Sequence, residues 1–95
     1  MLYTVRCSPY QDDFNAILGL ITDADDVLLI QNGVLLSVNG NRYLAELIRT
    51  GAGIYALQDD LDARGLANQV SDRVQVVNYN DFVSLTVKHQ QSFSW

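Results

Sequence analysis

The amino-acid sequence predicts an α/β protein in which a mostly parallel sheet of about five strands lies in a three-layer sandwich with helices. Short apolar runs alternate along the chain with segments of helical periodicity, which is typical of strands joined by right-handed helical crossovers. Residues 27–30 are continuously apolar, as expected of a strand that is covered on both faces of a parallel sheet. The chain has 95 residues and shows no repeat or linker, so residues 1–95 are expected to form a single domain.

Four segments are predicted to be strands, namely residues 2–6, 27–30, 53–57 and 74–77. The tail from Gln90 to Trp95 is too short for a helix and is expected to add a fifth strand around Phe93. Residues 34–38 fit both a helical turn and an extended segment, so both remain open.

Helices are predicted between these strands. Apolar residues recur at helical spacing over residues 14–21, and again over residues 43–48, between an Asn41 N-cap and Gly51 just past the end. Two further helices are predicted over residues 60–66, closed by Gly65, and from about Asn80 or Asp81 onward.

The composition argues against several classes of partner. The formal net charge is −5 and the six basic residues are scattered, whereas nucleic-acid binding needs concentrated Lys and Arg. A single cysteine excludes an intramolecular disulfide. The longest apolar run, residues 27–30, is far short of the roughly 20 residues that span a bilayer. We therefore expect a cytoplasmic protein without direct contact to nucleic acid or membrane.

Cys7 is the one candidate for catalysis. It follows the first predicted strand, and ligand crevices of parallel sheets lie at the carboxyl ends of strands. A thiolate there could be activated by the start of the next helix. Because the chain has no second cysteine and no histidine nearby in sequence, the sequence favours a small space-filling residue and hence no catalytic residue.

The other polar residues carry weaker signals. His89 lies near the end of the last predicted helix, where it is expected to interact with backbone carbonyls and the helix dipole rather than to act as a base. Ser8, Asp81 and His89 could be drawn as a triad, but residues of these types occur in most chains of this size. One cysteine and one histidine cannot supply a four-ligand zinc site, and no phosphate-binding glycine motif is present, so neither metal nor cofactor is expected.

Two loops and the tail complete the prediction. Residues 31–33, Gln-Asn-Gly, predict a tight turn with positive φ that could offer amide groups to the crevice, with a simple turn favoured. The acidic cluster of Asp23, Asp25 and Asp26 is interpreted as a solvated loop. Phe93 and Trp95 are large aromatic residues in a chain terminus, so they are predicted to form part of a subunit interface.

Several segments, in this order and spacing, resemble the TusB/DsrH family of small sulfur-relay subunits. They are Ser8-Pro9 followed by an aromatic residue, residues 28–34, 40–44, 55–57, 60–61 and 63–66, Tyr79, residues 81–83 and 85–89, and Trp95. The resemblance covers nearly the whole chain.

This resemblance implies a DsrE/DsrF/DsrH-like fold and a defined set of partners. Members similar to TusB assemble with TusC- and TusD-like subunits into a dimer of heterotrimers, which takes persulfide sulfur from a TusA-like donor and passes it to a TusE-like acceptor. The sulfur ends in the 2-thio group of the modified wobble uridine (5-methylaminomethyl-2-thiouridine) of tRNA. The sulfur-carrying cysteine belongs to the TusD-like subunit, so the resemblance implies that this chain is not itself an enzyme.

The resemblance also leaves alternatives. DsrH-type relatives carry a cysteine inside the first helix, where this chain has Ile17 or Leu18, and Cys7 does not occupy that position. The rival functions are a sulfurtransferase that carries persulfide on Cys7 and a DsrH-like subunit in sulfur oxidation. A homo-oligomeric domain that binds a small ligand in the strand-end crevice is a third.

Overall fold

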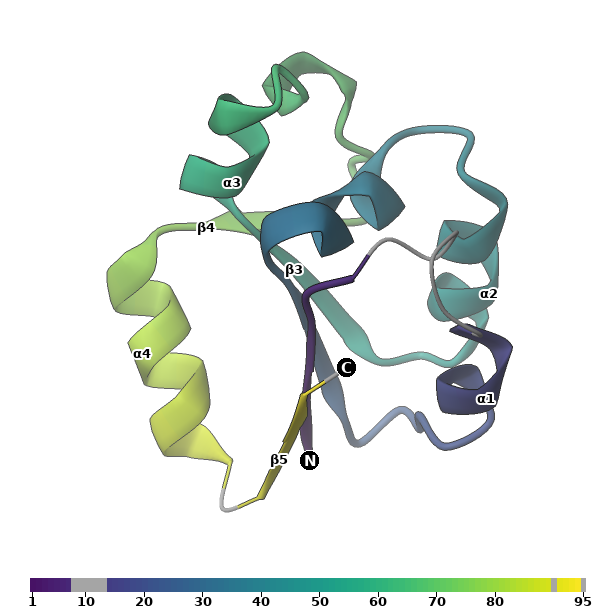
Figure 1. Ribbon diagram of the computed structural model, residues 1–95. Coiled ribbons are helices and arrows are strands. Elements are labelled where there is room, and N and C mark those ends of the chain that lie inside the picture. Colours follow the sequence, from purple (N-terminus) through teal and green to yellow (C-terminus); the bar gives the residue numbers. More distant parts are fainter. Residues whose placement is uncertain (8–13, 90, 95) are drawn as a thin grey trace.

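Five parallel strands form one sheet in the order β4-β3-β2-β1-β5 (Figure 1). The computed structural model describes residues 1–7, 14–89 and 91–94. The strands are β1 (Leu2–Val5), β2 (Asp26–Leu29), β3 (Gly53–Leu57), β4 (Gln75–Val77) and β5 (Ser92–Ser94). The predicted fold class is therefore confirmed, including the fifth strand around Phe93.

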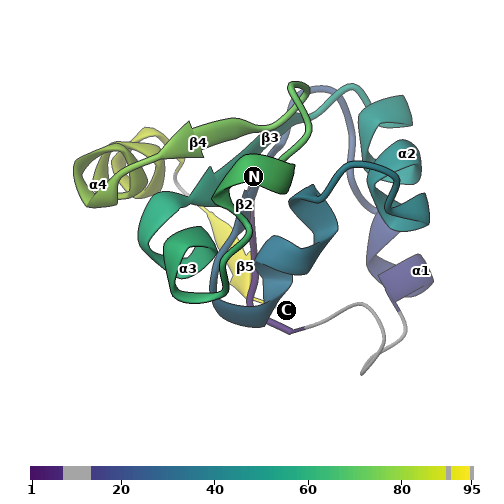
Figure 2. The same cartoon turned by 90° about the horizontal axis from the view of Figure 1, so that it is seen from above.

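The helices are divided unequally between the two faces of the sheet (Figures 1 and 2). They are α1 (Phe14–Leu18), the 3-10 helix η1 (Gln31–Ser37), α2 (Arg42–Arg49), α3 (Gln58–Ala63), the 3-10 helix η2 (Ala67–Gln69) and α4 (Tyr79–Lys88). The connections from β1 through to β4 run over one face, and the last connection returns through α4 over the other face to reach β5 beside β1. Strands β1 to β4 are added to the sheet in one direction, and β5 is added on the other side of β1. Because every crossover is right-handed, the connection to β5 must run over the opposite face.

The core reflects this division. The larger cluster lies between the sheet and the elements α1, η1, α2 and α3, and the smaller cluster joins Leu85 of α4 to Leu2, Leu28 and Val77 of the sheet. Every residue of β1 and β2 is buried, because these strands are covered on both faces. This accounts for the continuous apolar run in β2.

Most helix ends follow local sequence signals. The Asn41 side chain accepts hydrogen bonds from the backbone amides of Tyr43 and Leu44 at the start of α2, and Gly51 after its end has a φ of 78°. Asn78 and Asp81 form a capping box that starts α4 at Tyr79, slightly before the predicted position. Gly65, with a φ of 66°, follows α3 as predicted.

Residues 31–33 differ from the sequence prediction. They begin the 3-10 helix η1, which also contains most of the segment 34–38 that the sequence left open. The positive φ is at Gln31, 50°, and not at Gly33. Gly33 is required for another reason: a Cβ there would overlap the backbone carbonyl of Val5 at the end of β1. Close approach, and not turn geometry, therefore selects glycine at this position.

Candidate functional site

Cys7 lies at the carboxyl edge of the sheet, where the sequence placed it. It follows β1 after Arg6 and is partly exposed. η1 lies directly against this strand end, since the amide of Ile30 donates to the carbonyl of Val5 at 3.0 Å and Gly33 packs on the same carbonyl. Ser8, which follows Cys7, lies outside the described residues.

The polar residues of η1 serve to hold α3. The backbone amide of Gln31 donates to a carboxylate oxygen of Asp60 at 2.7 Å, and the guanidinium of Arg64 donates to Oδ1 of Asn32 at 3.0 and 3.2 Å. Arg64 also lies 3.8 Å from the Asp60 carboxylate. The amide oxygen of Asn32 is therefore occupied in a structural network, which disfavours the ligand-binding interpretation of residues 31–33.

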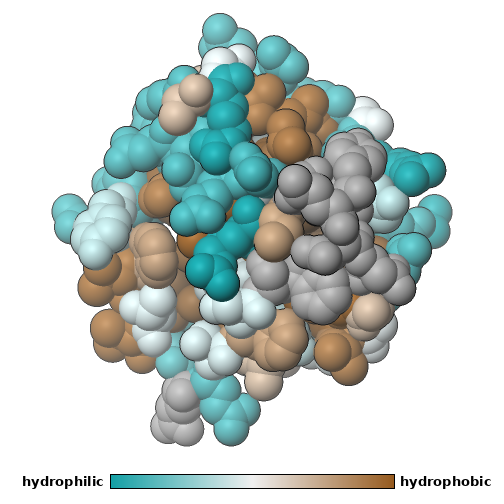
Figure 3. All heavy atoms as spheres, in the orientation of Figure 1, coloured by the Kyte–Doolittle hydropathy of each residue, from teal (hydrophilic) through white to brown (hydrophobic). Residues whose placement is uncertain are grey.

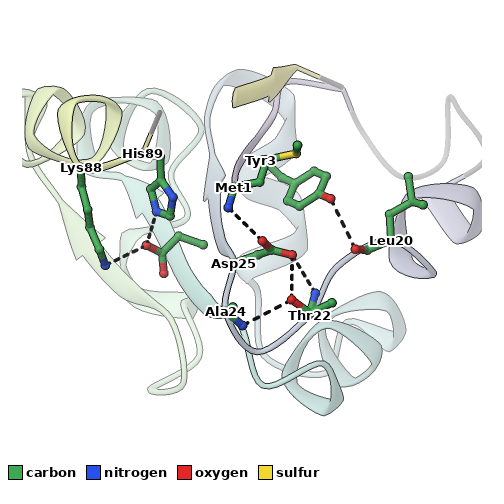
Figure 4. A network of polar contacts seen from close by, with 9 residues as sticks. Met1, Tyr3, Leu20, Thr22, Ala24, Asp25, Lys88 and His89 are labelled. Atoms are coloured by element: carbon green, nitrogen blue, oxygen red, sulfur yellow. Dashed lines mark hydrogen bonds and ion pairs between the residues drawn. The ribbon is translucent and has the colours of Figure 1, made fainter. Parts of the chain in front are cut away.

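His89 lies at the amino ends of the strands, whereas Cys7 follows the carboxyl end of β1. Its Nε2 is 2.7 Å from Oδ2 of Asp26, the first residue of β2, and Nζ of Lys88 donates to the same oxygen at 3.2 Å (Figure 4). In the parallel register Leu2 lies beside Asp26, so Cys7 is five residues, or roughly 16 Å, farther along the sheet. His89 therefore cannot act as a base for Cys7.

Two residues of the notional triad, Asp81 and His89, lie apart, and the third, Ser8, lies outside the described residues. Asp81 is in the first turn of α4 and His89 is its C-cap, so roughly 12 Å of helix lies between them. Asp81 is engaged in the capping box with Asn78, and His89 is engaged with Asp26. Asp81 and His89 thus serve structural roles at the two ends of one helix. The backbone N–H of His89 donates to the Leu85 carbonyl, whereas its side chain contacts a carboxylate instead of the expected carbonyls.

Asp26 is a buried carboxylate that stays charged. Burial would raise the pKa of Asp26, but the hydrogen bonds and positive charges of His89 and Lys88 outweigh burial and hold the pKa below its ordinary value. Its side chain is 11% exposed, and that of His89 is 10% exposed. This long-range pair ties the end of α4 to the start of β2.

The solvated-loop interpretation of the acidic cluster is wrong for Asp26, and Asp25, which does lie in the loop before β2, is held there by hydrogen bonds. Asp26 is buried in β2, and Asp25 accepts from the amino group of Met1 at 2.9 Å and from the backbone and hydroxyl of Thr22 (Figure 4). These contacts lower the pKa of Asp25 although burial acts to raise it. Asp23 is exposed, as expected. Asp25 has a local partner in Thr22 and a distant one in Met1, whereas the partner of Asp26, His89, is 63 residues away and is signalled by no local pattern.

The tail forms an edge strand with one aromatic side chain on the surface. β5 pairs with β1, and Phe93 lies opposite Tyr3, with ring centroids 6.0 Å apart. Phe93 is nevertheless 42% exposed. Trp95, the other residue of the predicted interface, lies outside the described residues.

Neither a metal site nor a membrane span is found in the part of the chain that the structure describes. Among those residues, no group of three or more His, Cys, Asp or Glu side chains is placed to hold a metal ion. No helix among them is long and apolar enough to cross a bilayer.

The fold and the site define a small parallel α/β domain in which, among the residues that the structure describes, Cys7 follows the carboxyl end of β1. The same fold occurs in the crystal structure of the ychN protein from E. coli, with a TM-score of 0.79, 16% identity and coverage of 99% of this chain and 97% of that one. It also occurs in MTH1491, a protein of unknown function from Methanobacterium thermoautotrophicum, with a TM-score of 0.73, 14% identity and coverage of 99% and 96%.

The chain belongs to the DsrH-like family. The family model described as DsrH like protein matches residues 7–92. Protein TusB of Photorhabdus laumondii is 60% identical over 95 residues, and Protein TusB of Escherichia coli strain K12 is 46% identical, each with 100% of both chains covered. The resemblance drawn from the sequence motifs is therefore confirmed.

Proposed function

We propose that this chain, acting as a single domain of residues 1–95, is a non-catalytic subunit of a sulfur-relay complex. Its task is to complete the assembly and to shape the surface around a cysteine that a partner subunit carries. The observation that carries the proposal is the 60% identity to Protein TusB over the full length of both chains. The structural role of His89 and the distance between His89 and Cys7 support it, because they leave Cys7 without that base.

In the proposed relay, the complex is cytoplasmic and passes persulfide sulfur for 2-thiolation of the modified wobble uridine, 5-methylaminomethyl-2-thiouridine, in tRNA. This chain assembles with TusC- and TusD-like subunits into a dimer of heterotrimers, between a TusA-like donor and a TusE-like acceptor. Its net charge of −5 and scattered basic residues support a subunit that leaves contact with RNA to others.

The first helix supports this role over a DsrH-like role in sulfur oxidation. The position at which DsrH-type relatives carry a cysteine corresponds to Ile17 or Leu18. Ile17 is 1% exposed within the larger core cluster, and Leu18 packs against that cluster. Both positions therefore hold apolar side chains that contribute to packing.

Phe93, together with Trp95, is proposed as part of the subunit interface. Phe93 offers an exposed ring on an edge strand, and aromatic rings are favoured interface anchors.

Coexpression with the two sister subunits tests the proposal. We expect the chain to copurify with the TusC- and TusD-like subunits in equal stoichiometry, measured by native mass spectrometry. Recovery of this chain only as a free monomer, under conditions in which the sisters bind each other, would contradict the proposal.

The second candidate is a sulfurtransferase that carries persulfide on Cys7. The position of Cys7, partly exposed at the carboxyl edge, favours it. Intact mass after incubation with a cysteine desulfurase, the donor protein and cysteine distinguishes the two. An adduct of about 32 Da, one sulfur atom, that is absent in Cys7→Ser would support the second candidate.

A further inference from the structure

The chain contains two Asn-Gly pairs, Asn32-Gly33 and Asn39-Gly40, and the fold holds them differently. Asparagine followed by glycine is prone to lose its side-chain amide spontaneously, because the next backbone nitrogen, unhindered by a Cβ, can attack the side-chain carbon. The two pairs share this intrinsic reactivity. The surroundings of each pair therefore decide whether it reacts in the folded chain.

The first pair is immobilised within η1. The side-chain oxygen of Asn32 accepts from the guanidinium of Arg64 at 3.0 and 3.2 Å, so the side chain is held toward α3. The N–H of Gly33 donates to the carbonyl of Ile30 at 2.9 Å, and Gly33 packs so closely on the Val5 carbonyl that a Cβ would overlap it. The Gly33 nitrogen therefore cannot turn toward the Asn32 side chain unless η1 leaves the end of β1.

The second pair lies in the turn that joins η1 to α2. Both residues are exposed, Gly40 has a φ of 85°, and an added Cβ on Gly40 would meet no atom within 4 Å. The backbone N–H of Gly40 donates to no group in the described part of the chain. The Asn39 amide makes a long hydrogen bond of 3.4 Å to the carbonyl of Val70. Figure 3 shows hydrophilic surface at the upper right rim, the side on which this turn leads into α2 in Figure 1.

The chain on both sides of the Asn39-Gly40 peptide is anchored. The N–H of Asn39 donates to the carbonyl of Gln69 at 2.8 Å, and the N–H of Asn41 donates to the carbonyl of Val38 at 3.1 Å. The peptide between Asn39 and Gly40 can therefore rotate while these contacts stay in place. That rotation brings the Gly40 nitrogen toward the Asn39 side chain.

We propose that Asn39 is a site of spontaneous deamidation in the folded chain and that Asn32 is protected. The backbone nitrogen of Gly40 bonds to Cγ of Asn39, the bond from Cγ to Nδ2 breaks, and ammonia leaves with the proton of the Gly40 N–H. Water then opens the succinimide at one of its two carbonyl carbons, which yields aspartate or isoaspartate. The site does not depend on the proposed function.

The modification changes the turn in two ways. A carboxylate replaces the amide that donates to Val70, which makes the net charge of −5 more negative by one. Isoaspartate also inserts a side-chain carbon into the backbone, next to the Asn39 N–H that donates to Gln69. Both changes weaken the link between the end of η1 and the segment that follows η2.

Peptide mass spectrometry of the full chain after incubation in mildly alkaline buffer tests the site. The buffer is made in water labelled with heavy oxygen, and each succinimide that opens takes up one labelled oxygen, so only product formed during the incubation is counted. Chymotrypsin cleaves after leucine, and Leu35 and Leu36 lie between the two pairs, so each pair is measured on its own peptide. The same incubation in concentrated urea gives the reactivity of both pairs in the unfolded chain.

Asn39→Gln is the matched variant, because it keeps an amide at this position but would have to close a larger ring that forms far more slowly. Circular dichroism checks that the wild type and the variant fold. In the folded wild type we expect labelled product at Asn39 to form at least about tenfold faster than at Asn32, which reacts only when η1 opens locally. In urea the two rates should be comparable.

Absence of labelled product at Asn39 in the folded wild type would overturn the proposal, as would labelling of Asn32 at an equal rate. The corresponding peptide of folded Asn39→Gln should stay unlabelled. Label on that peptide at the wild-type rate would also overturn the proposal, because it would then enter at Asn41. These outcomes leave the proposed function standing, since copurification tests that separately.

Discussion

The imidazole of His89, which ends α4, lies 2.7 Å from the carboxylate of Asp26, which begins β2, although 63 residues separate them in sequence. This contact anchors the helix that covers one face of the sheet just before the chain turns into β5. The contact also lies at the amino ends of the strands, whereas Cys7 follows the carboxyl end of β1.

Asp26→Asn should destabilise the fold by about 1–3 kcal/mol near neutral pH, because it removes the charge that accepts from His89 and Lys88. The pKa of Asp26 is lower in the folded chain than in the unfolded chain. Its contribution to stability is therefore present above the unfolded value of about 4 and is lost as pH falls through the folded pKa. Urea unfolding at several pH values measures this, and the stability of the variant should fall less steeply toward acid. Asp23→Asn, at an exposed position, is the control and should behave as the wild type.

His89→Ala should loosen β5 more than the rest of the sheet. The amide of Leu2 donates to the carbonyl of Gln91 at 3.1 Å, directly after the region that His89 anchors. Hydrogen exchange measured by NMR should show protection of the Leu2 amide falling by about tenfold, with smaller changes in β3. Lys88→Ala should have the weaker effect, since the Lys88 side chain is 64% exposed and its ion pair is screened by water. Equal effects of the two variants would contradict the anchoring role of His89.

Gly33→Ala should lower stability by about 2–4 kcal/mol, because the added Cβ collides with the Val5 carbonyl and pushes η1 off the end of β1. Gly19→Ala is the matched control: its Cβ would meet no atom within 4 Å and its φ is not positive. Thermal unfolding compares the two. A Gly33→Ala chain as stable as Gly19→Ala would show that η1 can move away from β1 at little cost.

Cys7→Ser should leave sulfur transfer by the assembled complex within about twofold of the wild-type rate, because the proposed carrier is a cysteine of another subunit. The measurement is the amount of thiolated tRNA formed over time by the reconstituted relay. A loss of tenfold or more, with the complex still assembled, would instead favour a sulfur-carrying role for Cys7.

Phe93→Ala should reduce recovery of the complex with the sister subunits severalfold, because it removes an exposed ring from the proposed interface. Ser92→Ala, at an exposed position on the same strand, is the control for disturbance of β5 itself. If both substitutions lowered recovery equally, the effect would belong to the pairing of β5 with β1 and not to an interface.

The boundaries of the predicted elements show where sequence reasoning succeeds. The start of α2 was predictable because the Asn41 side chain bonds to amides only two and three residues away. Most of β2 was predictable because burial on both faces favours an apolar run, here residues 27–29, whereas its first residue, Asp26, was not. The position of Cys7 at a strand end followed from the same pattern, as did the edge strand around Phe93.

The errors have one common cause. Asp26 has the sequence context of a loop residue because its partner, His89, is 63 residues away. Gly33 looked like a turn glycine because its closest neighbour, Val5, belongs to another strand. The exposure of Tyr79, Val83 and Val87 on α4 is not evident from the sequence, since the same spacing also suits a buried face.

By itself, the sequence determined the fold class, the family and the scarcity of reactive side chains, because local hydrogen bonds, periodic burial and motif order are written along the chain. Only the tertiary structure decided that His89 contacts Asp26 and that Cys7 lies at the other end of the strands from this pair. It also decided that one face of α4 is apolar and exposed. These outcomes depend on which distant segments pack together, and in a parallel sheet strand order and register decide that.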